Sequence, residues 1–132
     1  MRPLRKIASG GELSRVSLAI AVCTNSDRNI PTLVYDEVDV GISGAVASSV
    51  GEKLKQLSKN NQIICITHLA QVASYGNHHF KVNKIQQDAE TRTSITKLTE
   101  EERRFELARI LSGAKVNEKS LAAASELIQE SA

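Results

Sequence analysis

The 132 residues amount to one domain's worth of chain, and their 41% hydrophobic content is ordinary for a globular protein. Only 3% of the residues are aromatic and the net charge is +2, which argues against a base-stacking or strongly basic nucleic-acid surface. No apolar run approaches the ~18 residues of a membrane span, and no signal peptide is recognisable. We therefore expect a cytoplasmic protein with an aliphatic core and no membrane contact.

The two cysteines and the basic residues near the amino terminus are also informative. The cysteines lack Cys-x-x-Cys spacing and lie in apolar runs, so Cys23 and Cys65 are predicted to be reduced core residues rather than a disulfide or a zinc site. The only local excess of positive charge is near the amino terminus, and we favour a solvated face over a phosphate-facing patch for its members: Arg2, Arg5, Lys6 and Arg15.

The first half of the chain alternates helices and strands. A helix is predicted over residues 11–25 and a strand over residues 32–35. After a loop at residues 41–44, a second helix runs to about residue 58 and a second strand covers residues 62–67. Both strands are short continuous apolar runs, which is typical of parallel strands covered on both faces. The first helix has apolar residues at helical spacing: Leu13, Val16, Ile20 and Cys23.

The second half is predicted to contain a short helix, a β-hairpin and two closing helices. These elements are expected at residues 69–75, at 79–84 and 94–98 with a polar connection over 86–92, and at 101–111 and 118–130. The order of elements indicates an α/β layer with a small antiparallel edge.

A serine and two glycines stand directly before the first helix. Backbone N–H groups free of Cβ atoms at a helix start suit a phosphate group, with preorganised donors contributing ~3–4 kcal/mol each to a transition state. The plainer interpretation is a flexible N-cap in which Ser9 satisfies the first turn. Taken alone, this segment allows both interpretations: Ser9, Gly10, Gly11 and Glu12.

Polar residues at the ends of the two apolar strands are the other chemical signal. Asp36 can hold Mg²⁺ through water, and the adjacent Glu37 can polarise an attacking water. His68 follows the second strand and is interpreted as a group that senses or polarises a γ-phosphate. A pair of solvated carboxylates and a structural histidine are the simpler alternatives, but the combination suggests nucleotide hydrolysis.

Two other patterns are set aside. His78 and His79 lack a third ligand at metal spacing and are expected to be structural. The run from Gly41 to Gly44 invites comparison with a nucleophile elbow, but Ala45 breaks the Gly-x-Ser-x-Gly frame, so no serine hydrolase is predicted.

The serine–glycine segment before the first helix, the carboxylates after the first strand and the histidine after the second strand resemble the second half of an ABC-type ATPase head. In that family they would be the signature motif, the Walker B strand and the switch histidine. The amino-acid sequence of these motifs is most similar to the SMC-like bacterial DNA-repair family RecN. The similarity lies in residues 7–15, 36–44 and 67–73, and in the Leu-Ser-Gly at residues 111–113. A transporter pattern would have an aspartate seven residues after Asp36, but Ser43 stands there. That departure disfavours a transporter and leaves a role of Asp39 and Ser43 in dimer contact as an implication only.

The resemblance implies that residues 1–132 are the carboxyl-terminal lobe of a P-loop NTPase-type head, with the Walker A lobe and a coiled coil absent and Met1 an added start. It implies ATP and Mg²⁺ as cofactors, with ATP sandwiched between two heads of a homodimer. Asp36 (Mg²⁺), Glu37 and His68 (catalysis) would act in cis, and Ser9, Gly10, Gly11 and Glu12 on the γ-phosphate in trans. The full-length protein would act in double-strand break repair and recombination at the nucleoid.

Two alternatives remain open at this stage. One is an interaction module that has kept the fold and lost catalysis, and the other is another SMC-type or transporter lobe without a repair role. Without its neighbouring lobe, the chain is expected to expose an apolar face and a strand edge, and so to be prone to self-association.

Overall fold

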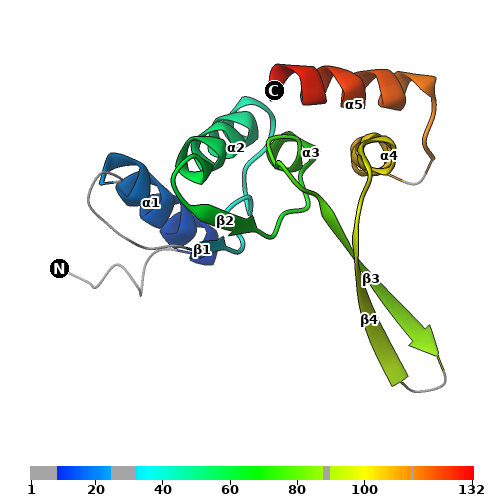
Figure 1. Cartoon of the computed structure of the whole chain (residues 1–132), viewed down its shortest axis with the longest axis horizontal. Coiled ribbons are helices and arrows are strands. Elements are labelled where there is room, and N and C mark those ends of the chain that lie inside the picture. The colour runs from blue at the N-terminus through cyan, green and yellow to red at the C-terminus, as the bar shows by residue number, and fades with distance from the viewer. Residues whose placement is uncertain (1–8, 25–31, 88–89, 114) are drawn as a thin grey trace.

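The computed structural model describes residues 9–24, 32–87, 90–113 and 115–132 (Figure 1). The order of elements confirms the predicted α/β organisation. The elements are α1 (Gly10–Cys23), β1 (Thr32–Tyr35), α2 (Gly44–Ser58), β2 (Gln62–Cys65), α3 (Ala70–Ala73), β3 (Phe80–Gln87), β4 (Glu90–Lys97), α4 (Glu100–Ser112) and α5 (Glu118–Glu130).

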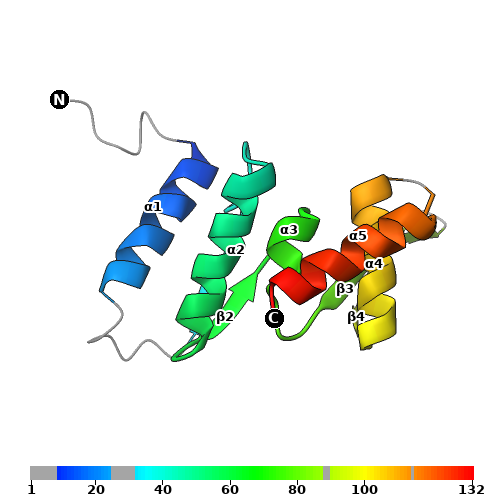
Figure 2. The same cartoon turned by 90° about the horizontal axis from the view of Figure 1, so that it is seen from above.

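The strands β1 and β2 form a parallel pair, as their continuous apolar character predicts. Their register runs from Thr32 opposite Gln62 to Tyr35 opposite Cys65, with α2 as the crossover between them. The helices α1 and α2 lie side by side, seen from above in Figure 2. One hydrophobic core joins these helices to one face of the strand pair, and its buried members are Leu18, Tyr35, Val38, Ala47, Val50, Leu54, Leu57 and Val72.

The other face of the strand pair is open, contrary to the expectation that both faces are covered. Val34 is 63% exposed, Ile64 47% and Ile66 56%, whereas their neighbours Leu33 and Ile63 pack against the core. Because side chains alternate along a strand, a pair with helices on one side only leaves every second apolar residue in solvent. The expected exposed apolar face is thus confirmed.

The buried face of α1 differs from the one that its strongest apolar spacing suggests. Leu13, Val16 and Ile20 are 37%, 51% and 52% exposed, and Cys23 is exposed as well, so the prediction that Cys23 is a core residue is wrong. The helix packs instead through Leu18, with Ala21 and Val22 beside it. A spacing pattern alone cannot choose between two apolar faces of one helix.

The hairpin of β3 and β4 is longer than predicted. Its antiparallel register runs from Phe80 opposite Lys97 to Gln87 opposite Glu90, so most of the polar tract predicted as a connection belongs to the strands, and residues 88–89 lie outside the described part. At its base the hairpin is tied to α4, since Lys81 Nζ lies 2.6 Å from Glu106 Oε2. Hydrogen bonds from Arg109 and Lys81 outweigh burial and lower the pKa of Glu106.

The helices α3, α4 and α5 enclose a second core. Its buried members are Ala70, Leu107, Ala108 and Ala124. Polar contacts converge on the carbonyl oxygen of Ser74, which accepts hydrogen bonds from Arg103 Nη2 at 2.5 Å and from Ser131 Oγ at 2.8 Å. Lys55 of α2 donates to the carbonyl of Ser131 and so joins the last residues to the first core. None of the described helices has the length and apolar composition of a transmembrane segment.

Candidate nucleotide-binding edge

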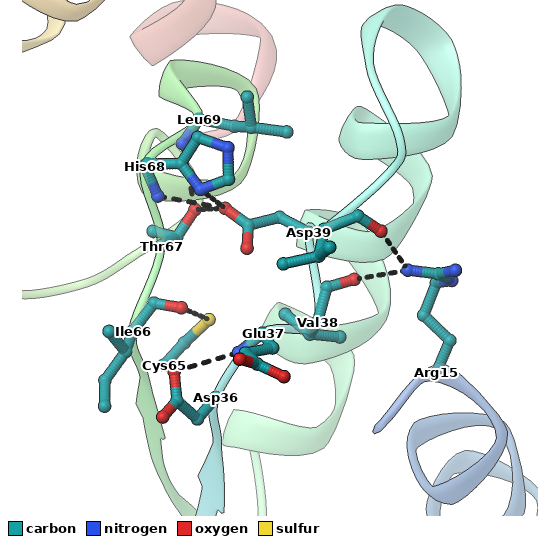
Figure 3. A network of polar contacts seen from close by, with 11 residues as sticks. Arg15, Asp36, Glu37, Val38, Asp39, Cys65, Ile66, Thr67, His68 and Leu69 are labelled. Atoms are coloured by element: carbon teal, nitrogen blue, oxygen red, sulfur yellow. Dashed lines mark hydrogen bonds and ion pairs between the residues drawn. The ribbon is translucent and has the colours of Figure 1, made fainter. Parts of the chain in front are cut away.

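The polar ends of β1 and β2 lie at the same edge of the strand pair (Figure 3). Tyr35 is paired with Cys65, and one residue further the amide of Ile66 donates to the carbonyl of Tyr35 at 2.9 Å. Because the strands are parallel, Asp36 and Glu37 leave β1 where Thr67 and His68 leave β2. The structure therefore brings the predicted carboxylates and the predicted histidine to one edge.

The amino-terminal end of α1 is built by a reciprocal capping box. Ser9 Oγ accepts from the amide of Glu12 at 3.3 Å, and the carboxylate of Glu12 accepts from the amide of Ser9 at 2.7 Å. These bonds from Ser9 lower the pKa of the Glu12 carboxyl. The cap leaves the amides of Gly10 and Gly11 without a hydrogen-bond acceptor among the described residues. The N-cap is thus present, and two further donors remain beside it.

The two glycines allow α1 to lie directly against the loop that follows β1. A Cβ on Gly10 would lie 2.5 Å from Glu37 Oε2, and a Cβ on Gly11 would lie 2.9 Å from the carbonyl oxygen of Glu37. The approach at Gly11 requires a residue without a Cβ because the neighbouring atom is backbone, whereas at Gly10 the flexible carboxylate of Glu37 can move aside. The helix start and the predicted water-activating carboxylate are therefore in contact within one chain.

Side chains of α1 hold this loop through its carbonyl groups. Arg15 Nη1 donates to Val38 at 3.2 Å and to Val40 at 2.8 Å, and Ser14 Oγ donates to Asp36 at 2.9 Å. The expectation that Arg15 belongs to a solvated face is therefore wrong. Arg2, Arg5 and Lys6, the other members of the predicted basic cluster, lie outside the described residues.

Both carboxylates after β1 are exposed. Asp36 Oδ1 accepts from the amide of Glu37 at 2.9 Å, and Asp36 Oδ2 accepts no hydrogen bond from a described residue. Glu37 has φ 58°, a left-handed conformation that is uncommon for a residue other than glycine and is often found at functional sites. The loop thus turns sharply immediately after the strand.

The chemistry of these side chains fits Mg²⁺ and not a protein-caged metal. The described residues contain no group of three or more His, Cys, Asp or Glu side chains placed to hold a metal ion. Mg²⁺ keeps several waters and is commonly bound by one or two carboxylates together with phosphate oxygens. The free oxygen of Asp36 at an exposed strand end meets that requirement.

A buried aspartate joins the two loops, and the sequence did not reveal this role. Asp39 is 2% exposed, and its Oδ2 accepts from Thr67 Oγ1 at 2.5 Å and from the amide of His68 at 2.9 Å. The same oxygen lies 3.1 Å from His68 Nδ1. Burial raises the pKa of Asp39, but the hydrogen bonds from Thr67 and His68 outweigh it and the pKa is lowered. The carboxylate is thus charged and faces the interior of this chain, not a second copy.

Three other potentially reactive side chains lack the features of a nucleophile. Burial, with Asp39 and Asp36 nearby, raises the pKa of the Cys65 thiol to about 12, so it stays protonated. Ser43 is the N-cap residue of α2 without a side-chain hydrogen bond in the cap. His79 belongs to the hairpin base, where burial and then Arg103 lower its pKa.

No protein-family model matches the chain. It is 54% identical over 127 residues, 96% of its length, to the DNA repair protein RecN of Haemophilus influenzae. It is 52% identical over 129 residues to RecN of Xylella fastidiosa and 46% identical over 131 residues to RecN of Treponema pallidum, covering 98% and 99% of the chain. The chain is a homologue of RecN. It spans 23% of the length of each of these RecN proteins.

A solved structure supports the same fold. It comes from work on ATP-driven dimerization and DNA-stimulated activation of SMC ATPases and matches this RecN homologue with a TM-score of 0.57 at 19% identity. The match covers 83% of this chain and 65% of that one. The α/β fold with its hairpin and closing helices is thus the fold of that SMC ATPase structure.

Proposed function

We propose that this chain is the carboxyl-terminal lobe of an ATPase head in an SMC-like DNA-repair protein, with residues 1–132 as one lobe. The observation that carries the proposal is the meeting of three elements in a RecN homologue. The start of α1, the loop after β1 and the loop after β2 all reach one edge of the strand pair. An interaction module would not require Asp36, Glu37 and His68 together at that edge.

The side chains after β1 and β2 have roles that their geometry supports. Glu37 is exposed at a sharp turn and would hold and deprotonate the attacking water. Asp36 would hold Mg²⁺ through water, and Mg²⁺, when bound, neutralises charge on the phosphates. His68, with its side chain 69% exposed, would contact the γ-phosphate. The role of Ser9, Gly10, Gly11 and Glu12 on the γ-phosphate of ATP held by a second head rests on the family resemblance, since Gly10 and Gly11 lie against Glu37 of the same chain in this structure.

The partners of this lobe follow from the same proposal. The amino-terminal lobe with its Walker A loop would cover the exposed apolar face of the strand pair, which comprises Val34, Ile64 and Ile66. A second head would dimerise with it through ATP, and the full-length protein would engage DNA at the nucleoid in the cytoplasm. The relatives are DNA repair proteins, and the structural neighbour belongs to a group in which ATP drives dimerization.

The decisive experiment compares Glu37→Gln with Glu52→Gln in the full-length protein. Glu52 lies exposed on α2 and serves as the matched control. We expect Glu37→Gln to lower the ATP turnover rate about 10²–10⁴-fold, because the amide cannot accept the proton of water, while Glu52→Gln leaves it unchanged. Steady-state phosphate release measures both. Full activity of Glu37→Gln would overturn the assignment of Glu37.

The lobe by itself is expected to be inactive. The phosphate-gripping Walker A loop has no counterpart in the sequence, so most nucleotide affinity is missing. Addition of the purified amino-terminal lobe should restore hydrolysis, and the Glu37→Gln lobe should fail to do so. ATP turnover by the lobe alone at the rate of the full-length protein would contradict the requirement for the amino-terminal lobe.

A further inference from the structure

Asp39 is the least expected charged residue of this edge because it is buried without a cationic side chain bonded to it. Its Oδ2 accepts hydrogen bonds from Thr67 Oγ1 and from the amide of His68, and it lies 3.1 Å from His68 Nδ1 in an ion-pair contact. Burying a carboxylate is costly unless hydrogen bonds satisfy it. An aspartate that takes two hydrogen bonds and an ion-pair contact from one dipeptide therefore holds that dipeptide in place.

The backbone around Asp39 is itself held on the opposite side. Arg15 donates to the carbonyls of Val38 and Val40, which flank Asp39, and the amide of Ile42 donates to the carbonyl of Asp39 at 3.4 Å. Val38 is fully buried in the first core. Asp39 thus has little freedom to follow His68, so it is His68 that is positioned by the contact (Figure 3).

The contact also determines which nitrogen of the imidazole is available. A charged carboxylate has only acceptor oxygens, so a nitrogen beside it is stabilised when it carries a proton. The charge of Asp39 Oδ2, 3.1 Å from His68 Nδ1, favours a proton on Nδ1, and Nε2 is the atom directed away from Asp39 on a largely exposed ring.

We propose that Asp39 is the positioning residue of the nucleotide edge, fixing both the backbone of Thr67–His68 and the Nδ1-protonated form of His68. Nε2 is then the atom presented to the nucleotide. The effect of Asp39 on ATP hydrolysis rests on the proposed function, in which His68 contacts the γ-phosphate. The contact by which Asp39 orients the His68 ring does not depend on that function. The two statements therefore need separate measurements.

The first measurement is a double-mutant cycle in the full-length protein with Asp39→Ala, His68→Ala and the double variant. We expect Asp39→Ala to lower kcat about tenfold or more with KM within about twofold, since Asp39 acts through His68 and does not bind nucleotide. The double variant should then be no slower than His68→Ala. Independent losses that multiply would overturn the proposal.

A conservative variant guards against loss of folding. Asp39→Asn keeps an acceptor oxygen and the side-chain volume, so it should recover part of the kcat that Asp39→Ala loses. Equal kcat losses in Asn and Ala variants that both retain the circular dichroism spectrum of the parent would contradict positioning by the acceptor.

The second measurement is independent of ATP hydrolysis. Long-range proton–nitrogen NMR of the full-length protein, labelled with ¹⁵N-histidine and assigned with His68→Gln, reports which nitrogen carries the proton. We expect a protonated Nδ1 in the parent and loss of this fixed state in Asp39→Ala. An unprotonated Nδ1 in the parent would overturn the proposal. If His68→Ala leaves turnover unchanged while the NMR result holds, the proposed role of His68 fails but the hold of Asp39 on the ring stands.

Discussion

The two cores of this chain differ in how they treat their apolar surface. The core of α1, β1, α2 and β2 is one-sided, because the strand pair buries Leu33 and Ile63 but exposes Val34 and Ile64. The core of α3, α4 and α5 is enclosed by its own helices and braced by polar contacts to Ser74. The strand pair of the half that carries the proposed chemistry therefore leaves one apolar face open, whereas α3, α4 and α5 cover their own core, although Phe105 of α4 is 54% exposed.

The short helix α3 connects the two cores. Val72 belongs to the first core and Ala70 to the second, so opposite faces of a single turn contribute to both. This arrangement raises the question of whether the two halves unfold together or separately.

Truncating one buried leucine in each core tests the comparison most strongly. Leu57→Ala and Leu107→Ala remove side chains that are 1% and 0% exposed, so each should lower the free energy of unfolding by about 2–5 kcal/mol. Native-state hydrogen exchange should show faster exchange in α2 for Leu57→Ala and in α4 and α5 for Leu107→Ala. Leu111→Ala on α4, where the side chain is 36% exposed, is the control with a smaller loss.

A uniform response would remove the distinction between the halves. If either variant accelerated exchange equally in α2 and α4, the two cores would form one cooperative unit, and the one-sidedness of the first would not make it independently labile.

The second prediction concerns the close approach of α1 to the loop after β1. In Gly11→Ala the new Cβ would meet the Glu37 carbonyl and, at 3.2 Å, the Cβ of Val40, so stability should fall by about 1–3 kcal/mol. In Gly10→Ala the nearest atoms belong to the movable carboxylate of Glu37, so the loss should be below about 1 kcal/mol. Urea denaturation of both variants measures the difference, and equal losses would show that α1 is free to shift.

The smallest expected effect is on the open face of the strand pair. Val34→Thr should change the free energy of unfolding by less than about 0.5 kcal/mol, because the side chain is 63% exposed, and should reduce self-association in sedimentation velocity. Val50→Thr makes the same chemical change at a residue 8% exposed and should cost about 1–3 kcal/mol. A loss in Val34→Thr as large as in Val50→Thr would mean that the open face is covered in solution.

The order and type of the elements were predictable because local pattern determines them. The runs that form β1 and β2 are too short and too apolar for helices. Three helices begin after residues whose side chains accept hydrogen bonds from the first turn, namely Ser9, Thr99 and Asn117. What the pattern could not decide was orientation. The exposed stripe of α1 is more apolar than the buried face at Leu18, and only the close packing of α2 selects between them.

The candidate edge was predictable as a set of residues but not as a network. Asp36, Glu37 and His68 stand at strand ends, where parallel pairing brings them to one side. Asp39 also follows β1, but four residues after the strand ends, and nothing in the sequence pattern marks it as a partner of Thr67 and His68. The burial of Asp39 and its hydrogen bonds depend on the turn at Glu37. Glu37 has a left-handed backbone conformation, which the sequence does not predict.

The register of the two sheets carries a consequence for the order in which the chain assembles. Hairpin pairs such as Gln87 with Glu90 are near neighbours in sequence, and hairpins of this kind close in about 1–10 μs. The pairing of Thr32 with Gln62 must wait for α2 and β2 to be available, and closing so long a loop costs more entropy. We therefore expect the hairpin to close before β1 pairs with β2, and so before the candidate edge forms, when the chain refolds.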